Sequence, residues 1–164
     1  YDLAKKVGIS IYDPLIIPKL LEIYPFDIIQ TPFNIVDKRL INQKNLEVLN
    51  NKNIEIHVRS IFLQGMLLLN KIEQRKISQY KGFFKIWNDW LKYNKLSKVQ
   101  ACLSFVNSIE AISKIIIGID NISHLKQILK TEIKSLDQIP DWSDVIDDIL
   151  INPFKWNFKR VYEK

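Results

Sequence analysis

The chain has 164 residues, of which 47% are hydrophobic and 26% charged, a balance typical of one globular domain spanning residues 1–164. Its net charge of +6 comes from lysines spread along the whole chain, without the dense basic stripe of a nucleic-acid-binding protein. A single cysteine, Cys102, excludes an internal disulfide, and no apolar run is long enough for a membrane span, so we expect a cytoplasmic protein with no nucleic-acid or membrane partner.

Strands and helices are predicted to alternate along the chain. Asp13 and Pro14 are typical of a helix start, and Ser97 is a typical helix cap. The predicted elements, in chain order, are a strand at residues 6–10, a helix at 14–23, a strand at 26–31, a helix at 42–51, a strand at 54–60, a loop with at most one helical turn at 61–81, helices at 83–93 and 98–108, a strand at 114–117, and helices at 121–130 and 142–150.

This alternation predicts an α/β fold with a parallel sheet, because parallel strands need crossover helices between them. Two architectures remain open from the local pattern: a doubly wound open sheet, or part of a (β/α)8 barrel. A complete barrel needs about 250 residues, so we do not expect this chain to close one by itself.

The strand at residues 54–60 alternates strictly between polar and apolar side chains. Glu55, His57 and Arg59 share one face, which would point into a barrel. Such a polar face is either catalytic machinery or, as we favour, an ionic network beneath a ligand. His57 and His124 are the only histidines, so we expect no metal site.

Three further side chains are expected to belong to the core. Cys102 lies on an apolar helical face, which indicates a buried, inert thiol. Trp87 and Trp90 are three residues apart on one predicted helix and are expected to pack against the sheet.

Four segments, taken in order, resemble the aldo/keto reductase family from the fifth strand of its barrel to its C-terminus. The segments are Gly8-Ile9-Ser10, then residues 29–34 (IQTPFN) with Asp37-Lys38-Arg39, then residues 59–65 (RSIFLQG), and finally residues 116–120 (IIGID). The resemblance implies a parallel (β/α) half-barrel equivalent to strands 5–8 of a TIM barrel, with outer helices. It also implies an oxidoreductase that reduces an aldehyde or ketone with NADP, or NAD, as cofactor.

The resemblance further implies roles for individual residues in cofactor binding. Ser10 and Gln30 match residues that hydrogen-bond the nicotinamide carboxamide. The residues that match the pyrophosphate loop are Ser60, Phe62 and Gly65, and those that match the adenosine region are Gly118, Asp120 and Gln127.

The chain departs from the family pattern at several positions. Arg59 stands where many members carry an aromatic residue that stacks on the nicotinamide, and a guanidinium can stack likewise or reach the pyrophosphate or substrate. Ile11, Ile61 and Ile128 replace Asn, Pro and Asn. No basic residue for a 2′-phosphate is obvious beyond His124 and Lys126, so the choice between NADP and NAD stays open.

No residue of this chain matches the family's catalytic Asp, Tyr, Lys and His, which belong to the first half of the barrel. We therefore assign no catalytic residue and expect the chain to be inactive alone. Two hypotheses stay open: a fragment of an aldo/keto reductase, or a non-catalytic half-barrel that serves as a binding or assembly module. Two unpaired sheet edges also predict that the isolated chain is either poorly soluble or a homodimer that mimics a full barrel.

Overall fold

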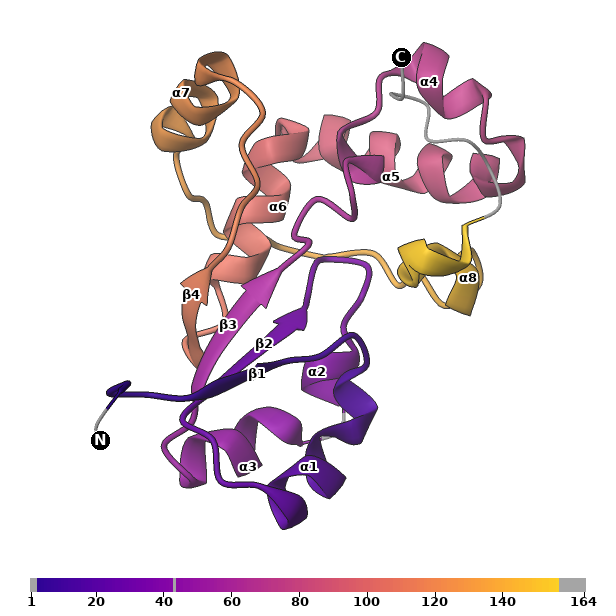
Figure 1. Cartoon of the computed structure of the whole chain (residues 1–164). Helices are drawn as coiled ribbons and strands as arrows, with labels where there is room; N and C mark the ends of the chain where they lie inside the picture. Colours follow the sequence, from indigo (N-terminus) through magenta and orange to yellow (C-terminus); the bar gives the residue numbers. More distant parts are fainter. Residues whose placement is uncertain (1–2, 43, 157–164) are drawn as a thin grey trace.

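The centre of the molecule is one open sheet of four parallel strands (Figure 1). The computed structural model describes residues 3–42 and 44–156. The strands are β1 (Gly8–Ser10), β2 (Ile28–Pro32), β3 (Glu55–Arg59) and β4 (Ile112–Ile115), and they lie in the order β1-β2-β3-β4. Each strand pairs in parallel with the next, and helices surround the sheet, so the predicted α/β half-barrel is confirmed.

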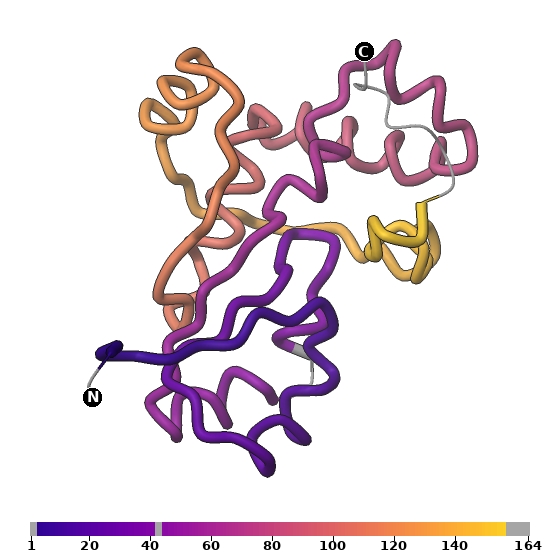
Figure 2. Tube along the Cα trace, viewed as in Figure 1, coloured from indigo at the N-terminus to yellow at the C-terminus, as the bar shows by residue number. Residues whose placement is uncertain are grey.

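Helices connect the strands and flank the sheet. They are α1 (Ile17–Ile23), α2 (Arg39–Asn42), α3 (Asn45–Asn51), α4 (Lys71–Arg75), α5 (Lys81–Tyr93), α6 (Lys98–Asn107), α7 (Ile122–Lys130) and α8 (Asp148–Ile151). After α7 the chain runs back across the molecule to α8, as the trace in Figure 2 shows. Within the described residues, no helix combines the length and apolar character needed to cross a bilayer.

Several predicted elements have other bounds in the structure. The predicted helix at residues 142–150 is wrong over its first half, because helix α8 begins only at Asp148, with the Asp147 carboxylate accepting from the Leu150 N–H. The turn of helix allowed for within the predicted loop at residues 61–81 is helix α4. Asn70 and Glu73 form a capping box at its start, which satisfies backbone N–H groups that a short helix leaves unpaired.

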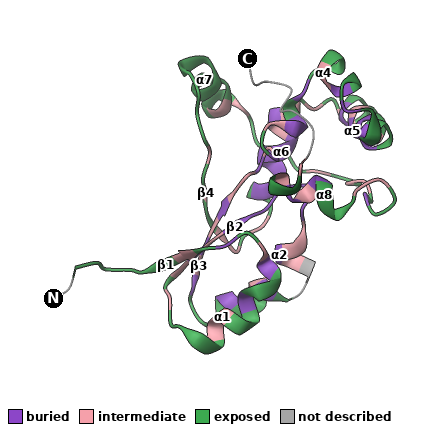
Figure 3. Ribbon diagram, turned by 45° about the vertical axis from the view of Figure 1, so that its right-hand side comes forward, coloured by how far each residue is buried: buried purple, intermediate pink, exposed green. Residues whose placement is uncertain are grey.

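The sheet buries one face and leaves the other accessible. Ile29, Ile56 and Val58 are fully buried, while their neighbours in β2 and β3 are only partly covered. Figure 3 shows that α7 is mostly exposed, and none of its residues is buried. The expected alternation of the third strand is therefore confirmed, and the polar side chains lie on the accessible face.

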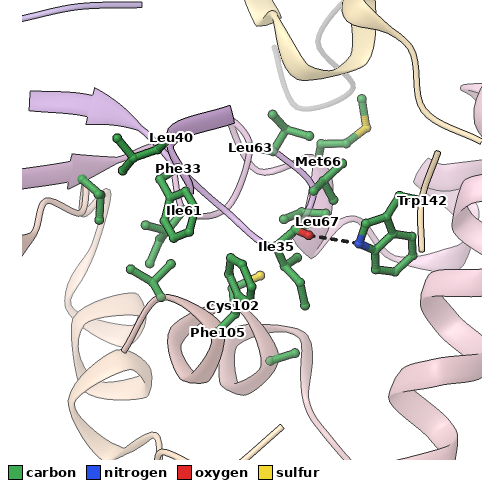
Figure 4. Packing of buried hydrophobic residues seen from close by; sticks show 14 of the residues in the cluster. Phe33, Ile35, Leu40, Ile61, Leu63, Met66, Leu67, Cys102, Phe105 and Trp142 are labelled. Carbon is green, nitrogen blue, oxygen red and sulfur yellow. Dashed lines mark hydrogen bonds between the residues drawn. The ribbon is translucent and has the colours of Figure 1, made fainter. Parts of the chain in front are cut away.

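The core beyond the strands joins the loops to α6 (Figure 4). Phe33 packs against Phe105 with ring centroids 5.3 Å apart. The Trp142 indole N–H donates to the buried Ile35 carbonyl over 3.0 Å, which holds the segment before α8 on the core. Cys102 is fully buried, and this burial raises the pKa of its thiol, in agreement with the expected inert cysteine.

Trp87 and Trp90 of α5 are also part of this core. Their rings stack with centroids 5.6 Å apart, and both are buried. The Trp87 indole N–H donates to the Leu67 carbonyl over 3.2 Å, so the helix is fixed to the segment that follows β3. The expectation that these two residues serve packing is confirmed.

Candidate functional site

Ser10 and Gln30 lie side by side at the carboxyl ends of two neighbouring strands. Ser10 of β1 is in register with Gln30 of β2, and the Ser10 hydroxyl donates to Gln30 Oε1 over 3.2 Å. The Ile11 N–H donates to the Gln30 carbonyl over 2.8 Å, which continues the ladder past the end of β1. Both side chains are on the accessible face, where a ligand can reach them.

Gln30 keeps hydrogen-bonding capacity in this arrangement. Its side-chain oxygen accepts from Ser10, and its amide nitrogen has no partner among the residues that the structure describes. Together the hydroxyl and the amide therefore offer both a donor and an acceptor to a planar polar group such as a carboxamide.

Toward the amino ends of the strands, the same face of the sheet carries an ionic network. Glu55 contacts Lys6, and His57 Nε2 lies 3.2 Å from Glu55 Oε2. The pKa of Glu55 lies below its ordinary value, mainly because Lys6 donates a hydrogen bond to the carboxylate and next because His57 does. The ionic network expected on this face is confirmed for Glu55 and His57.

Arg59, at the end of β3, does not belong to that network. Its guanidinium donates to the Ile11 carbonyl over 3.1 Å and to Ser60 Oγ over 3.4 Å. The guanidinium carbon also lies 4.6 Å from the centroid of the Tyr12 ring. Because Arg59 is in register with Pro32, two residues beyond Gln30, its charge lies beside the Ser10–Gln30 pair.

The loop after β3 has an unusual backbone. Ser60, Leu63, Gln64 and Gly65 all have positive φ angles, between 47° and 82°. Left-handed residues turn successive N–H groups toward one side of a loop, and such concave backbones can bind anions. Ser60 and Gly65 lie in this loop, where the Leu63 N–H donates to the Ser60 carbonyl, and the Phe62 side chain partly packs on the core.

Asn34 connects this loop to the one after β2. The side chain is fully buried, and its Nδ2 donates to the Ser60 carbonyl over 3.2 Å. Its Oδ1 accepts from the N–H groups of Val36 and Asp37, at 3.0 and 2.8 Å. The residue therefore caps a turn and fixes the neighbouring loop.

The three residues matched to the adenosine end lie elsewhere. Gly118 and Asp120 are on the exposed segment between β4 and α7, and Gln127 is on the exposed surface of α7. The Asp120 side chain is 90% exposed, with one oxygen 3.8 Å from His124 Nδ1. In Figure 1, α7 stands apart from the ends of β1 and β2.

A cavity of about 160 Å³ opens next to Arg59 and involves residues that sequence patterns did not single out. The lining residues that the sequence patterns missed are Tyr12, and Asn152 and Phe154 after α8; Arg39, from one of the segments that carry the resemblance, lines the cavity as well. No local signal points to these side chains, because segments far apart in the chain bring them together. A larger cavity, of about 650 Å³, lies at the opposite, amino ends of the strands around Tyr24 and Asp27.

No metal site accompanies these residues within the described ranges, where no three His, Cys, Asp or Glu side chains are grouped suitably for a metal ion. The model of the aldo/keto reductase family matches residues 3–144, which is most of the chain. A comparison with curated proteins gives no match.

Proposed function

Because the chain belongs to the aldo/keto reductase family, a family of oxidoreductases that act on carbonyl compounds, we propose that it forms the cofactor-binding side of an enzyme that reduces an aldehyde or ketone with NADPH or NADH. The bound cofactor supplies the hydride. This chain's residues bind and orient the cofactor, and the family's proton-transferring residues are assigned to none of them.

The Ser10–Gln30 pair is the observation that carries the proposal. The two side chains lie at the carboxyl ends of adjacent parallel strands, where barrel enzymes build their sites. The free amide nitrogen of Gln30 can donate to the carboxamide oxygen, and the Ser10 hydroxyl can accept from the carboxamide nitrogen. The residues present therefore fit a nicotinamide carboxamide.

The remaining cofactor contacts extend away from this pair. We assign the pyrophosphate to the loop that holds Ser60, Phe62 and Gly65, where positive φ angles favour an anion. The adenosine end would lie toward Gly118, Asp120 and Gln127 near the start of α7. Arg59 stands between the carboxamide and pyrophosphate positions and would contact the cofactor edge or the substrate.

The accessible inner face favours a second candidate function. Ser10 is exposed, and the Glu55–His57 pair is only partly covered, so the chain could bind a ligand or another protein without performing chemistry. A non-catalytic half-barrel of this kind would retain cofactor affinity.

Calorimetric titration of the chain with NADPH and with NADH tests the proposal. Ser10→Ala combined with Gln30→Ala should weaken binding roughly tenfold, because two hydrogen bonds contribute about 1–3 kcal/mol together. Ser135→Ala, at an exposed position on the segment after α7, is the matched control and should bind normally. ADP-ribose, which lacks nicotinamide, should bind the double variant and the original chain equally. NADPH affinity that is absent, or unchanged in the double variant, would contradict the proposal.

A further inference from the structure

The cavity beside Arg59 has the size and lining of a site for one small charged group. Its volume of about 160 Å³ is below the roughly 300 Å³ at which pockets for drug-sized ligands begin, so it cannot hold a nucleotide. Ser60 and Asn34 contribute polar groups from the two loops, Arg39 and Arg59 contribute two positive charges, and Asp37 contributes one negative charge.

The charge of Arg39 is already balanced. The Asp37 carboxylate, which is buried, accepts from Nε and Nη2 of Arg39, both over 2.8 Å. Asp13 adds a carboxylate oxygen 3.6 Å from Nη1. Asp148, the other acid whose charge acts on Arg39, contacts Lys155 and Asn152. Arg39 therefore has little capacity left for a ligand.

Arg59 differs because no carboxylate pairs with it in the part of the chain that the structure describes. Two of its five N–H donors reach neutral oxygens, of Ile11 and Ser60, so three remain for a ligand. The side chain is partly buried, and a cation withdrawn from water without an anionic partner is unfavourable. The Tyr12 ring, 4.6 Å away, and the two oxygens hold the guanidinium plane in place.

We propose that this cavity binds the carboxylate of the carbonyl substrate, which makes the substrate an oxo acid. The inference rests on the proposed function in one respect, because it takes from it that the nicotinamide lies at Ser10 and Gln30. Arg59 is bound to the Ile11 carbonyl directly beyond that pair, so an anion on Arg59 lies next to the reacting carbonyl. A guanidinium fork matches a carboxylate with two parallel hydrogen bonds.

The cofactor pyrophosphate is the competing anion, and the test separates the two. The cofactor-free chain is titrated by calorimetry with pyruvate, with its uncharged analogue pyruvamide, and with inorganic pyrophosphate. Pyruvate should bind and pyruvamide should not, because only pyruvate carries the carboxylate. Arg59→Met should weaken pyruvate binding at least tenfold, and Arg59→Lys, which keeps the charge but loses the fork, should weaken it less. Arg75→Met, at an exposed site on α4, should leave it unchanged.

Each result decides for or against the oxo-acid site. Pyruvate affinity that is equal in the Arg59→Met variant and the original chain overturns it, and so does the absence of pyruvate binding. If the Arg59→Met variant loses pyrophosphate binding but keeps pyruvate binding, Arg59 belongs to the cofactor site instead. These titrations contain no NADPH, so failure of NADPH to bind in the separate cofactor titration is distinguishable from failure of the carboxylate site.

Discussion

Asn34 gives the most direct residue-scale test of how the two loops are held together. Its amide donates to the Ser60 carbonyl, and its oxygen accepts from two N–H groups, all without contact with solvent. Asn34→Asp keeps the acceptor but places a second acceptor against the Ser60 carbonyl. We expect the free energy of unfolding at neutral pH to fall by about 1–3 kcal/mol in urea denaturation, because a buried acceptor loses its donor.

The pH dependence of this variant has a defined sign. Burial raises the pKa of the introduced carboxyl above its value in the unfolded chain, so the folded state binds its proton more tightly. The protonated carboxyl can donate to the Ser60 carbonyl, so the loss should shrink as pH falls from neutral toward about 4, the pKa of this carboxyl in the unfolded chain, and should change little below it. Asn50→Asp, exposed on α3, is the matched control. A loss that grows on acidification would contradict the assigned hydrogen bonds.

The sequence predicts the face and the end of the sheet on which a strand residue lies, but it does not predict which residues that side chain contacts. Period-two alternation and parallel pairing are local rules, and they place Ser10, Gln30 and Arg59 on one face at one end of the sheet. The partners of Arg59 come from Ile11 and Tyr12, far upstream in the chain. Such contacts depend on the loop conformation, which no local pattern specifies.

At the scale of elements, the close approach of β1 to β2 requires a glycine. A Cβ on Gly8 would lie 2.9 Å from both the Cβ and the carbonyl oxygen of Ile28, and neither atom can move without displacing β2. Gly8→Ala should therefore reduce the free energy of unfolding by about 1–3 kcal/mol, as other overpacked sites do. Urea denaturation with tryptophan fluorescence measures this change.

Gly118 supplies the matched control for that variant. A Cβ there meets nothing within 4 Å, and Gly118→Ala shares the same loss of backbone freedom in the unfolded chain. We expect it to change stability by less than about 0.5 kcal/mol, or to increase it slightly. Equal stability of the two variants would mean that β1 can shift away from β2 without cost.

The elements that sequence patterns predicted poorly are those decided by tertiary contacts. Residues 142–150 carry apolar side chains at helical spacing, but Trp142 is held instead by the Ile35 carbonyl, so the helix starts later. Likewise β4 ends at Ile115 rather than at residue 117, because its pairing with β3 fixes the register. Helix α4 did have a local signal, the capping pair Asn70 and Glu73.

At the scale of the whole molecule, the sheet remains open along β1. The Val7 carbonyl accepts from N–H groups of residues 27 and 28, and the Ile11 N–H donates to Gln30, so odd-numbered backbone groups of this segment face β2. By alternation, the N–H and C=O groups of Gly8 and Ser10 point outward, with no neighbouring strand in the described structure. An exposed edge of this kind is a template for another strand.

We therefore expect the isolated chain to form homodimers through β1, with sedimentation velocity showing a mass that doubles as concentration rises. Hydrogen exchange locates the contact: the amides of Gly8 and Ser10 should exchange more slowly at high concentration, because a partner strand would accept from them. The Ile9 amide faces β2 already, so its exchange should not depend on concentration and serves as the internal control. A constant monomeric mass, with unchanged exchange at Gly8 and Ser10, would show that this edge stays unpaired and that the half-barrel needs no second sheet.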